Sequence, residues 1–165
     1  MSEKYVIGIS DQKTAHSPDM LITYALGSCI GISLFDPSTS IGGLAHIMLP
    51  DSEMMNKKNN TKTDRMKYAD TAIIDLLKDM IHEGANRKRI IARIAGGANM
   101  FKSALPISAG TIGDRNTHAV KEQLMKLKIP LVGEDIGRDY GRTMFFDLTT
   151  GNISIQSLGK GVMEL

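Results

Sequence analysis

Residues 27–50 read GSCIGISLFDPSTSIGGLAHIMLP, and this stretch is the most informative part of the chain about its fold. Two apolar runs, 30–35 and 41–49, are separated by Asp36-Pro37 and a short polar segment. Asp and Pro favour turns, and two β-prone runs joined by a short turn are typical of a hairpin. The stretch therefore predicts an antiparallel hairpin with its tip near Ser38.

Further β-prone runs lie on both sides of this hairpin, at 5–9, 20–24, 90–95, 131–134, 143–148 and 152–157. Two other segments carry apolar residues at helical spacing. One covers 69–80, with Asp64 placed to cap its start and Gly84 after its end; the other runs from Asn116 or Thr117 to Leu127. This order predicts an α+β fold, a sandwich of sheets rich in antiparallel hairpins packed with two main helices, rather than a doubly wound parallel sheet.

The composition suits one globular domain spanning 1–165, because 42% of the residues are hydrophobic. A net charge of +2, and basic clusters without interleaved aromatics, give no reason to expect a nucleic-acid partner. The chain shows neither a signal peptide nor an apolar run of membrane-spanning length, so we expect a cytoplasmic protein that does not insert into a membrane. The polar, basic stretch 51–65 is a loop long enough to act as a lid.

Cys29 is the only cysteine, which excludes an intramolecular disulfide and a zinc site made of paired cysteines. A thiol near its ordinary pKa needs a neighbouring base, usually histidine, to act as a nucleophile. A hairpin tip near Ser38 places Cys29 opposite His46 or Ile47. One of these registers puts the imidazole beside the sulfur and the other puts it on the far face of the sheet, so the hairpin alone does not decide.

The other histidines have structural interpretations. His82 falls at a helix C-terminus, while His16 in a loop and His118 in the first turn of the second helix are surface positions. Histidines with metal-ligand spacing are absent, and we expect neither a metal nor another cofactor.

Two interpretations of Cys29 remain open on this basis. A free cysteine at a strand start is commonly a small core residue. Gly27 and Ser28 immediately before it nevertheless allow a tight turn, and their backbone N–H groups could face an oxyanion. Gly27 taken alone is equally consistent with a turn glycine.

Five motifs along the chain resemble, in order, the signature of the CheD family. They are Thr23-Tyr24-Ala25-Leu26-Gly27-Ser28-Cys29, Gly43-Leu44-Ala45-His46-Ile47-Met48-Leu49-Pro50-Asp51, Lys67-Tyr68-Ala69-Asp70-Thr71-Ala72, Ile94-Ala95-Gly96-Gly97-Ala98-Asn99-Met100-Phe101 and Ile112-Gly113-Asp114-Arg115-Asn116. The resemblance covers nearly the whole chain and implies a cysteine hydrolase that deamidates glutamine side chains of methyl-accepting chemotaxis receptors. It places the family's cysteine, histidine and threonine on Cys29, His46 and Thr23.

The resemblance implies the partners as well: chemoreceptors as substrates, and CheC, a phosphatase of the chemotaxis response regulator. Met100 and Phe101, in a loop that opens with glycines, are the candidate contact residues, although both could instead tuck into the core. Two alternatives to a deamidase are a regulatory module in which Cys29 has no catalytic role and another cysteine hydrolase, such as a methylesterase. A nucleic-acid clamp at 110–113 has no supporting basic face.

Overall fold

The computed structural model describes residues 1–54, 62–100 and 110–165 of the chain. Its strands are β1 (Lys4–Val6), β2 (Asp11–His16), β3 (Met20–Leu26), β4 (Ile30–Asp36), β5 (Ile41–Ile47), β6 (Ile91–Gly96), β7 (Leu131–Ile136), β8 (Arg142–Asp147), β9 (Ile153–Ser157) and β10 (Gly161–Glu164). Its helices are α1 (Lys62–Arg65), α2 (Ala69–His82) and α3 (Ile112–Lys126), with 3-10 turns at Ser52–Met54 and Arg87–Arg89. None of the helices in the described part of the chain is long and apolar enough to cross a membrane.

The strands form two sheets of five. The first sheet has the order β1-β3-β8-β9-β10 and the second the order β2-β5-β4-β6-β7. The pairs β1–β3 and β6–β7 are parallel, and the other pairs are antiparallel. The expected α+β class, with hairpin-rich sheets and two main helices, is therefore confirmed.

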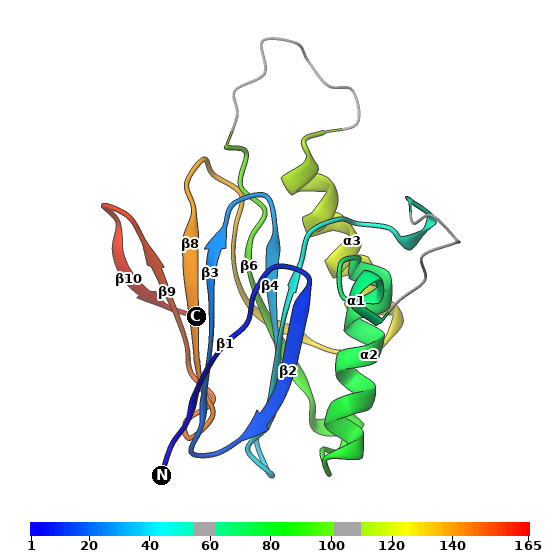
Figure 1. Cartoon of the computed structure of the whole chain (residues 1–165), viewed down its shortest axis with the longest axis vertical. Coiled ribbons are helices and arrows are strands. Elements are labelled where there is room, and N and C mark those ends of the chain that lie inside the picture. The colour runs from blue at the N-terminus through cyan, green and yellow to red at the C-terminus, as the bar shows by residue number, and fades with distance from the viewer. Residues whose placement is uncertain (55–61, 101–109) are drawn as a thin grey trace.

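The two sheets and the helices make three layers, with α2 and α3 covering the outer face of the second sheet (Figure 1). Side chains that alternate along β4 divide between two cores, because successive residues of a strand point to opposite faces. Ile30, Ile32 and Leu34 pack toward the helices, whereas Phe35 packs between the sheets against Phe146 of β8. The layer between the sheets is the one that contains the candidate site.

The β4–β5 hairpin was predicted correctly, but its register differs from the expected one. Asp36 pairs with Ile41, and the Ser40 N–H donates to the Asp36 carbonyl at 2.9 Å, so the turn is centred after Ser38. Gly31 consequently pairs with His46, and Cys29 lies one residue beyond the last pair of the ladder. Continued along the ladder, this register sets Cys29 opposite Met48 rather than His46 or Ile47.

The starts of both main helices also differ from the sequence prediction. The second main helix, α3, begins at Ile112, a turn before Asn116. Its start is fixed by a capping box, in which the Thr111 hydroxyl accepts from the Asp114 N–H at 3.2 Å. Tyr68, not Asp64, is the N-cap of α2, while Gly84 has the expected positive φ of 114°. His118 therefore lies in the second turn of α3.

Two strands were not predicted at all. β2 reads DQKTAH and buries only Gln12 fully, and β10 is exposed along its whole length, so neither shows apolar alternation. Both lie at the edge of a sheet, where one neighbour is enough to hold a polar strand. His16 is accordingly the last residue of β2 rather than part of a loop, although it is exposed as expected. Of the basic stretch 51–65, residues 55–61 lie outside the described chain, so the lid remains a prediction.

Candidate functional site

Thr23 and His46 meet in the layer between the two sheets. Thr23 comes from β3 in the first sheet and His46 from β5 in the second, and neither side chain is exposed. The Thr23 Oγ1 and His46 Nδ1 atoms are 2.7 Å apart. The fold thus brings two of the three expected catalytic residues into direct contact.

The contact fixes the tautomer of the imidazole. The Thr23 hydroxyl lies 2.7 Å from the Ile7 carbonyl, which can only accept a hydrogen bond. Since a hydroxyl has one proton, Thr23 donates it to Ile7 and accepts from the Nδ1–H of His46. The proton of the neutral ring is then on Nδ1, and Nε2 carries the lone pair that a general base requires.

The Nε2 atom of His46 is buried and has no hydrogen-bond partner among the described residues. Burial lowers the pKa of His46 to about 4, because desolvation penalises the charged imidazolium. At neutral pH the histidine is therefore uncharged, and its free nitrogen can accept a proton.

Cys29 lies on the same face of the second sheet as His46. It belongs to the buried cluster between the sheets, which also includes Leu26 and Met144. A Cβ on Gly31, the ladder partner of His46, would meet the side chains of Met144, Leu26 and Thr23, so this face of β4 points toward the first sheet. Cys29 precedes Gly31 by two residues, which makes it a diagonal neighbour of His46.

The thiol of Cys29 is not ionised in advance by its surroundings. Burial raises its pKa, and a hydrogen bond from its own backbone amide lowers the pKa by less. A thiol in such surroundings needs a base that can take its proton before it acts as a nucleophile. The neutral His46, on the same face of the sheet, is the candidate for that base.

The end of β6 fixes the backbone around Cys29. The Gly97 N–H donates to the Cys29 carbonyl at 2.9 Å, and the Ala98 N–H donates to the Gly27 carbonyl at 2.8 Å. Gly96 has a φ of 117°, and a Cβ there would overlap the Cys29 carbonyl oxygen. Only glycine lets β6 approach the cysteine loop this closely.

Gly27 and Ser28 precede Cys29 as a bend, as the sequence predicted. The Gly27 N–H donates to the Ala25 carbonyl at 3.1 Å, so this amide is already engaged. Ser28 has no such backbone bond from its N–H among the described residues outside the strands. The Gly27 amide therefore serves the turn, whereas the Ser28 amide remains the candidate for the oxyanion role that the sequence predicted for both residues.

Three exposed apolar side chains come from the segments around Cys29. They are Tyr24 in β3, Met48 after β5 and Met100 after β6. The Cγ atom of Met100 would lie 3.2 Å from a Cβ on Gly27, so this methionine packs over the cysteine loop and remains 46% exposed. Phe101, the other expected contact residue, lies outside the described residues.

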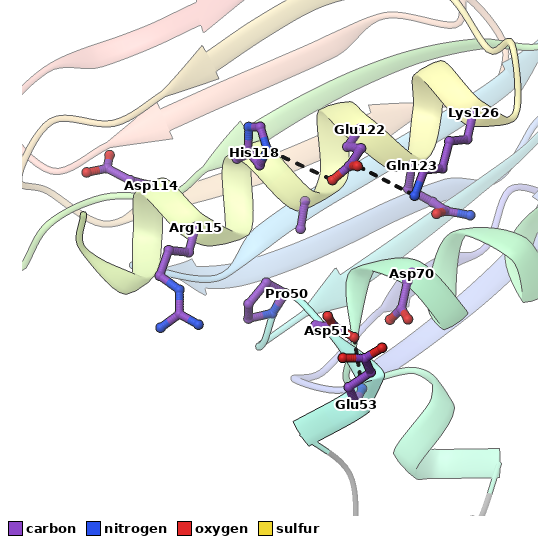
Figure 2. A pocket seen from close by; sticks show the side chains of 11 residues that line it. Pro50, Asp51, Glu53, Asp70, Asp114, Arg115, His118, Glu122, Gln123 and Lys126 are labelled. Carbon is purple, nitrogen blue, oxygen red and sulfur yellow. Dashed lines mark hydrogen bonds and ion pairs between the residues drawn. The ribbon is translucent and has the colours of Figure 1, made fainter. Parts of the chain in front are cut away.

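A cavity of about 630 Å³ lies elsewhere, between α3 and the segment that follows β5 (Figure 2). One wall is α3, from Asp114 to Lys126, and the other includes Pro50, Glu53 and Asp70. Neither Cys29, His46 nor Thr23 lines it. Within the described parts of the chain, no group of three or more His, Cys, Asp or Glu side chains could hold a metal ion.

For a reaction in which Cys29 is the nucleophile and His46 the base, replacing Thr23 with valine is expected to lower kcat by about 10- to 100-fold, less than the loss of the base itself. Valine has the shape of threonine but leaves Nδ1 of His46 and the Ile7 carbonyl unpaired, so the imidazole can adopt the tautomer with its proton on Nε2. Thr23→Ser keeps the hydroxyl and serves as the control. Equal rates for the valine and serine variants would contradict the role of Thr23 in fixing the tautomer.

Stability is expected to depend on pH through His46. Its folded pKa of about 4 lies below the ordinary 6.5, so between these values the unfolded chain binds more protons than the folded one. The contribution of His46 to the free energy of unfolding is complete above pH 6.5. It decreases by roughly 2–3 kcal/mol as the pH falls toward 4. Urea unfolding of wild type and His46→Gln at several pH values checks this, with exposed His118→Gln as control. Parallel curves for wild type and His46→Gln would contradict it.

Comparisons with known proteins point to one family. A family model described as CheD chemotactic sensory transduction matches residues 48–157. A probable chemoreceptor glutamine deamidase CheD of Moorella thermoacetica is 48% identical over 93% of this chain and 90% of its own length. Its counterpart of the same description from Caldanaerobacter subterraneus is 46% identical over 94% of both chains.

A solved structure also shows a likeness in fold. It is the Bacillus licheniformis hypothetical protein YfiH, with a TM-score of 0.48 and 17% identity over 76% of this chain. This chain spans about half the length of that structure.

Proposed function

We propose, from the premise that this chain belongs to the CheD family, that it hydrolyses the side-chain amide of glutamine residues on chemoreceptors. One observation of the structure supports a catalytic role independently of family membership. The Ile7–Thr23–His46 hydrogen-bond chain leaves an unpaired Nε2 on the same sheet face as the only cysteine. A protein that acted only by binding would not need a buried base with an unpaired nitrogen, which is costly to maintain.

The first half of the reaction forms a thioester. His46 Nε2 takes the proton from the Cys29 thiol, and the sulfur attacks the carbonyl carbon of the glutamine side chain. The tetrahedral intermediate collapses as the imidazolium gives its proton to the departing nitrogen, so ammonia leaves and the acyl group stays on Cys29. The neutral resting state of His46 allows it to take the proton first and return it afterwards.

The second half releases glutamate. His46 removes a proton from water, the hydroxide attacks the thioester carbon, and the Cys29 sulfur leaves and recovers its proton. Negative charge develops on the carbonyl oxygen in both halves. We assign its stabilisation to the backbone N–H group of Ser28, and a donor of this kind contributes about 3 kcal/mol to the transition state. No cofactor enters this sequence of steps.

The receptor would dock over the exposed side chains of Tyr24, Met48 and Met100, which come from the three chain segments next to the cysteine loop. Methionine and tyrosine suit such a surface because they give large adaptable apolar contacts. The resemblance to the family also suggests CheC as a partner, and we assign CheC to the same surface. A reduced thiol at the site fits a cytoplasmic location.

The proposal is tested by assaying a purified receptor cytoplasmic fragment for two products, ammonia and methanol. The protein is expected to release ammonia from the unmodified fragment and to leave methyl-esterified glutamates largely intact. Methanol without ammonia would identify an esterase instead. Neither product, with binding to the fragment retained, would favour the regulatory module.

A further inference from the structure

Asn116 joins the two segments that carry the candidate nucleophile and base. It lies on α3, is fully buried, and donates from Nδ2 to the Ser28 carbonyl at 2.9 Å and to the Met48 carbonyl at 3.0 Å. Ser28 immediately precedes Cys29, and Met48 follows His46 by two residues. One side-chain amide thus holds both segments.

The two bonds lie where the hairpin ladder stops. Ile30 and Ile47 are the last pair of β4 and β5 at this end, so the ladder itself does not tie Cys29 to Met48. The two hydrogens of the Asn116 amide act in place of a further rung, one on each strand. Beyond the end of the ladder, a side chain from another element therefore links the Ser28 and Met48 carbonyls.

The helix that presents Asn116 is itself held close to the cysteine loop. A Cβ on Gly113 would lie 2.6 Å from the Ala98 carbonyl oxygen, so only glycine lets the first turn of α3 approach this segment. Ala98 donates to the Gly27 carbonyl, as described above. The close approach of Gly113 to Ala98, and the bond from Ala98 to Gly27, thus hold the helix that carries Asn116 next to the cysteine loop.

The Oδ1 atom of Asn116 is buried without a hydrogen-bond partner among the described residues. Only the NH2 group can donate to two carbonyls, so this orientation necessarily turns the oxygen away from them. Leaving a buried acceptor unpaired is unfavourable, and native structures contain few such groups. Asn116 thus leaves its Oδ1 atom without a donor while its Nδ2 group bonds both carbonyls.

We propose that Asn116 is a positioning residue that aligns Cys29 with His46, an inference that rests on the proposed Cys-His reaction. It does not contact the substrate, and it acts through the backbone on either side of the site. Gln123 provides a matched comparison on the same helix. It lies two turns further on, is a buried amide like Asn116, and forms no side-chain hydrogen bond in the described part of the chain.

The test measures alkylation of Cys29 by iodoacetamide at neutral pH, which needs no receptor. The proteins compared are wild type, His46→Ala, Asn116→Asp, the double variant and Gln123→Ala. Aspartate has nearly the shape of asparagine but cannot donate to the two carbonyls.

We expect Asn116→Asp and His46→Ala each to slow alkylation by at least about tenfold. The double variant should be no more than about twofold slower than His46→Ala, because both substitutions act on the same proposed pair, Cys29 and His46. Gln123→Ala should stay within about twofold of wild type.

Deamidation of the receptor fragment gives the second readout, in which Asn116→Asp should lower kcat and leave KM within about threefold. Alkylation of Asn116→Asp at the wild-type rate, or an equal further loss in the His46→Ala background, would overturn the inference. If Asn116→Asp does not fold by circular dichroism, Asn116→Ser takes its place, and wild-type rates for that variant would likewise overturn it. A wild type that deamidates nothing would contradict the proposed function, while the alkylation comparison would still decide the role of Asn116.

Discussion

Replacing Cys29 with alanine is expected to lower kcat for glutamine deamidation by at least ~10⁴-fold, because the sulfur forms the covalent intermediate and its loss removes the route rather than slowing one step. The fold should persist, since the change deletes a single atom from a buried apolar cluster. Receptor affinity should also persist, because the exposed side chains proposed to bind the receptor are unchanged. Steady-state kinetics and a binding titration on the same preparations check both expectations.

The chain offers a chemical control for this variant. Cys29 is its only cysteine, so a thiol reagent that inactivates wild type can act at one residue alone. Alkylated wild type should match Cys29→Ala in rate. If Cys29→Ala kept a tenth or more of the wild-type kcat, the nucleophile would have to be another residue.

Replacing His46 with glutamine is expected to lower kcat/KM by about 10³-fold, within the range usual for loss of a general acid–base. Glutamine can still hydrogen-bond to Thr23, so the change removes proton transfer while preserving much of the local packing. The pH profile is a second readout. Since kcat/KM reports the free enzyme, wild type should remain active well below pH 6.5, because the His46 pKa is lowered to about 4.

The control for this variant is His118→Gln, because His118 is exposed on α3 and takes no part in the proposed reaction. It should have wild-type kinetics. If His46→Gln retained most of the activity, or if its loss appeared only in KM, His46 would not be the base.

The hairpin prediction shows what local sequence can establish about this site. The apolar runs on either side of Asp36-Pro37 correctly predicted β4 and β5, and so brought Cys29 near the His46 strand. The register could not be predicted, because it depends on how the chain passes through the turn, where Ser40 has a positive φ and bonds back to Asp36. A shift of one residue moves a side chain to the other face.

The residues that the first sheet contributes to the candidate site could not be predicted from local sequence patterns. Thr23 reaches His46 only because β3 packs across the second sheet, and the Ile7 carbonyl that directs its proton comes from the segment after β1. No spacing rule connects these residues. Family resemblance suggested Thr23, whereas the division of the strands into two sheets explains its role.

Asn116 belongs to one of the family motifs, but nothing in the local sequence indicates the positioning role that we propose for it. The sequence did contain a sign of the correct helix start, since Thr111 and Asp114 have capping-box spacing. A helix starting at Ile112 places Asn116 in its second turn rather than at its cap. Its two carbonyl partners, 88 and 68 residues away, could not be inferred without the fold.

Peptide mass analysis of a receptor cytoplasmic fragment incubated in heavy-oxygen water, with wild type beside Cys29→Ala, tests directly whether Cys29 deamidates glutamine. We expect particular glutamines to become glutamates carrying one heavy oxygen atom, and only with the wild-type protein. Equal conversion by both proteins, or no conversion by wild type while the fragment is bound, would contradict this expectation.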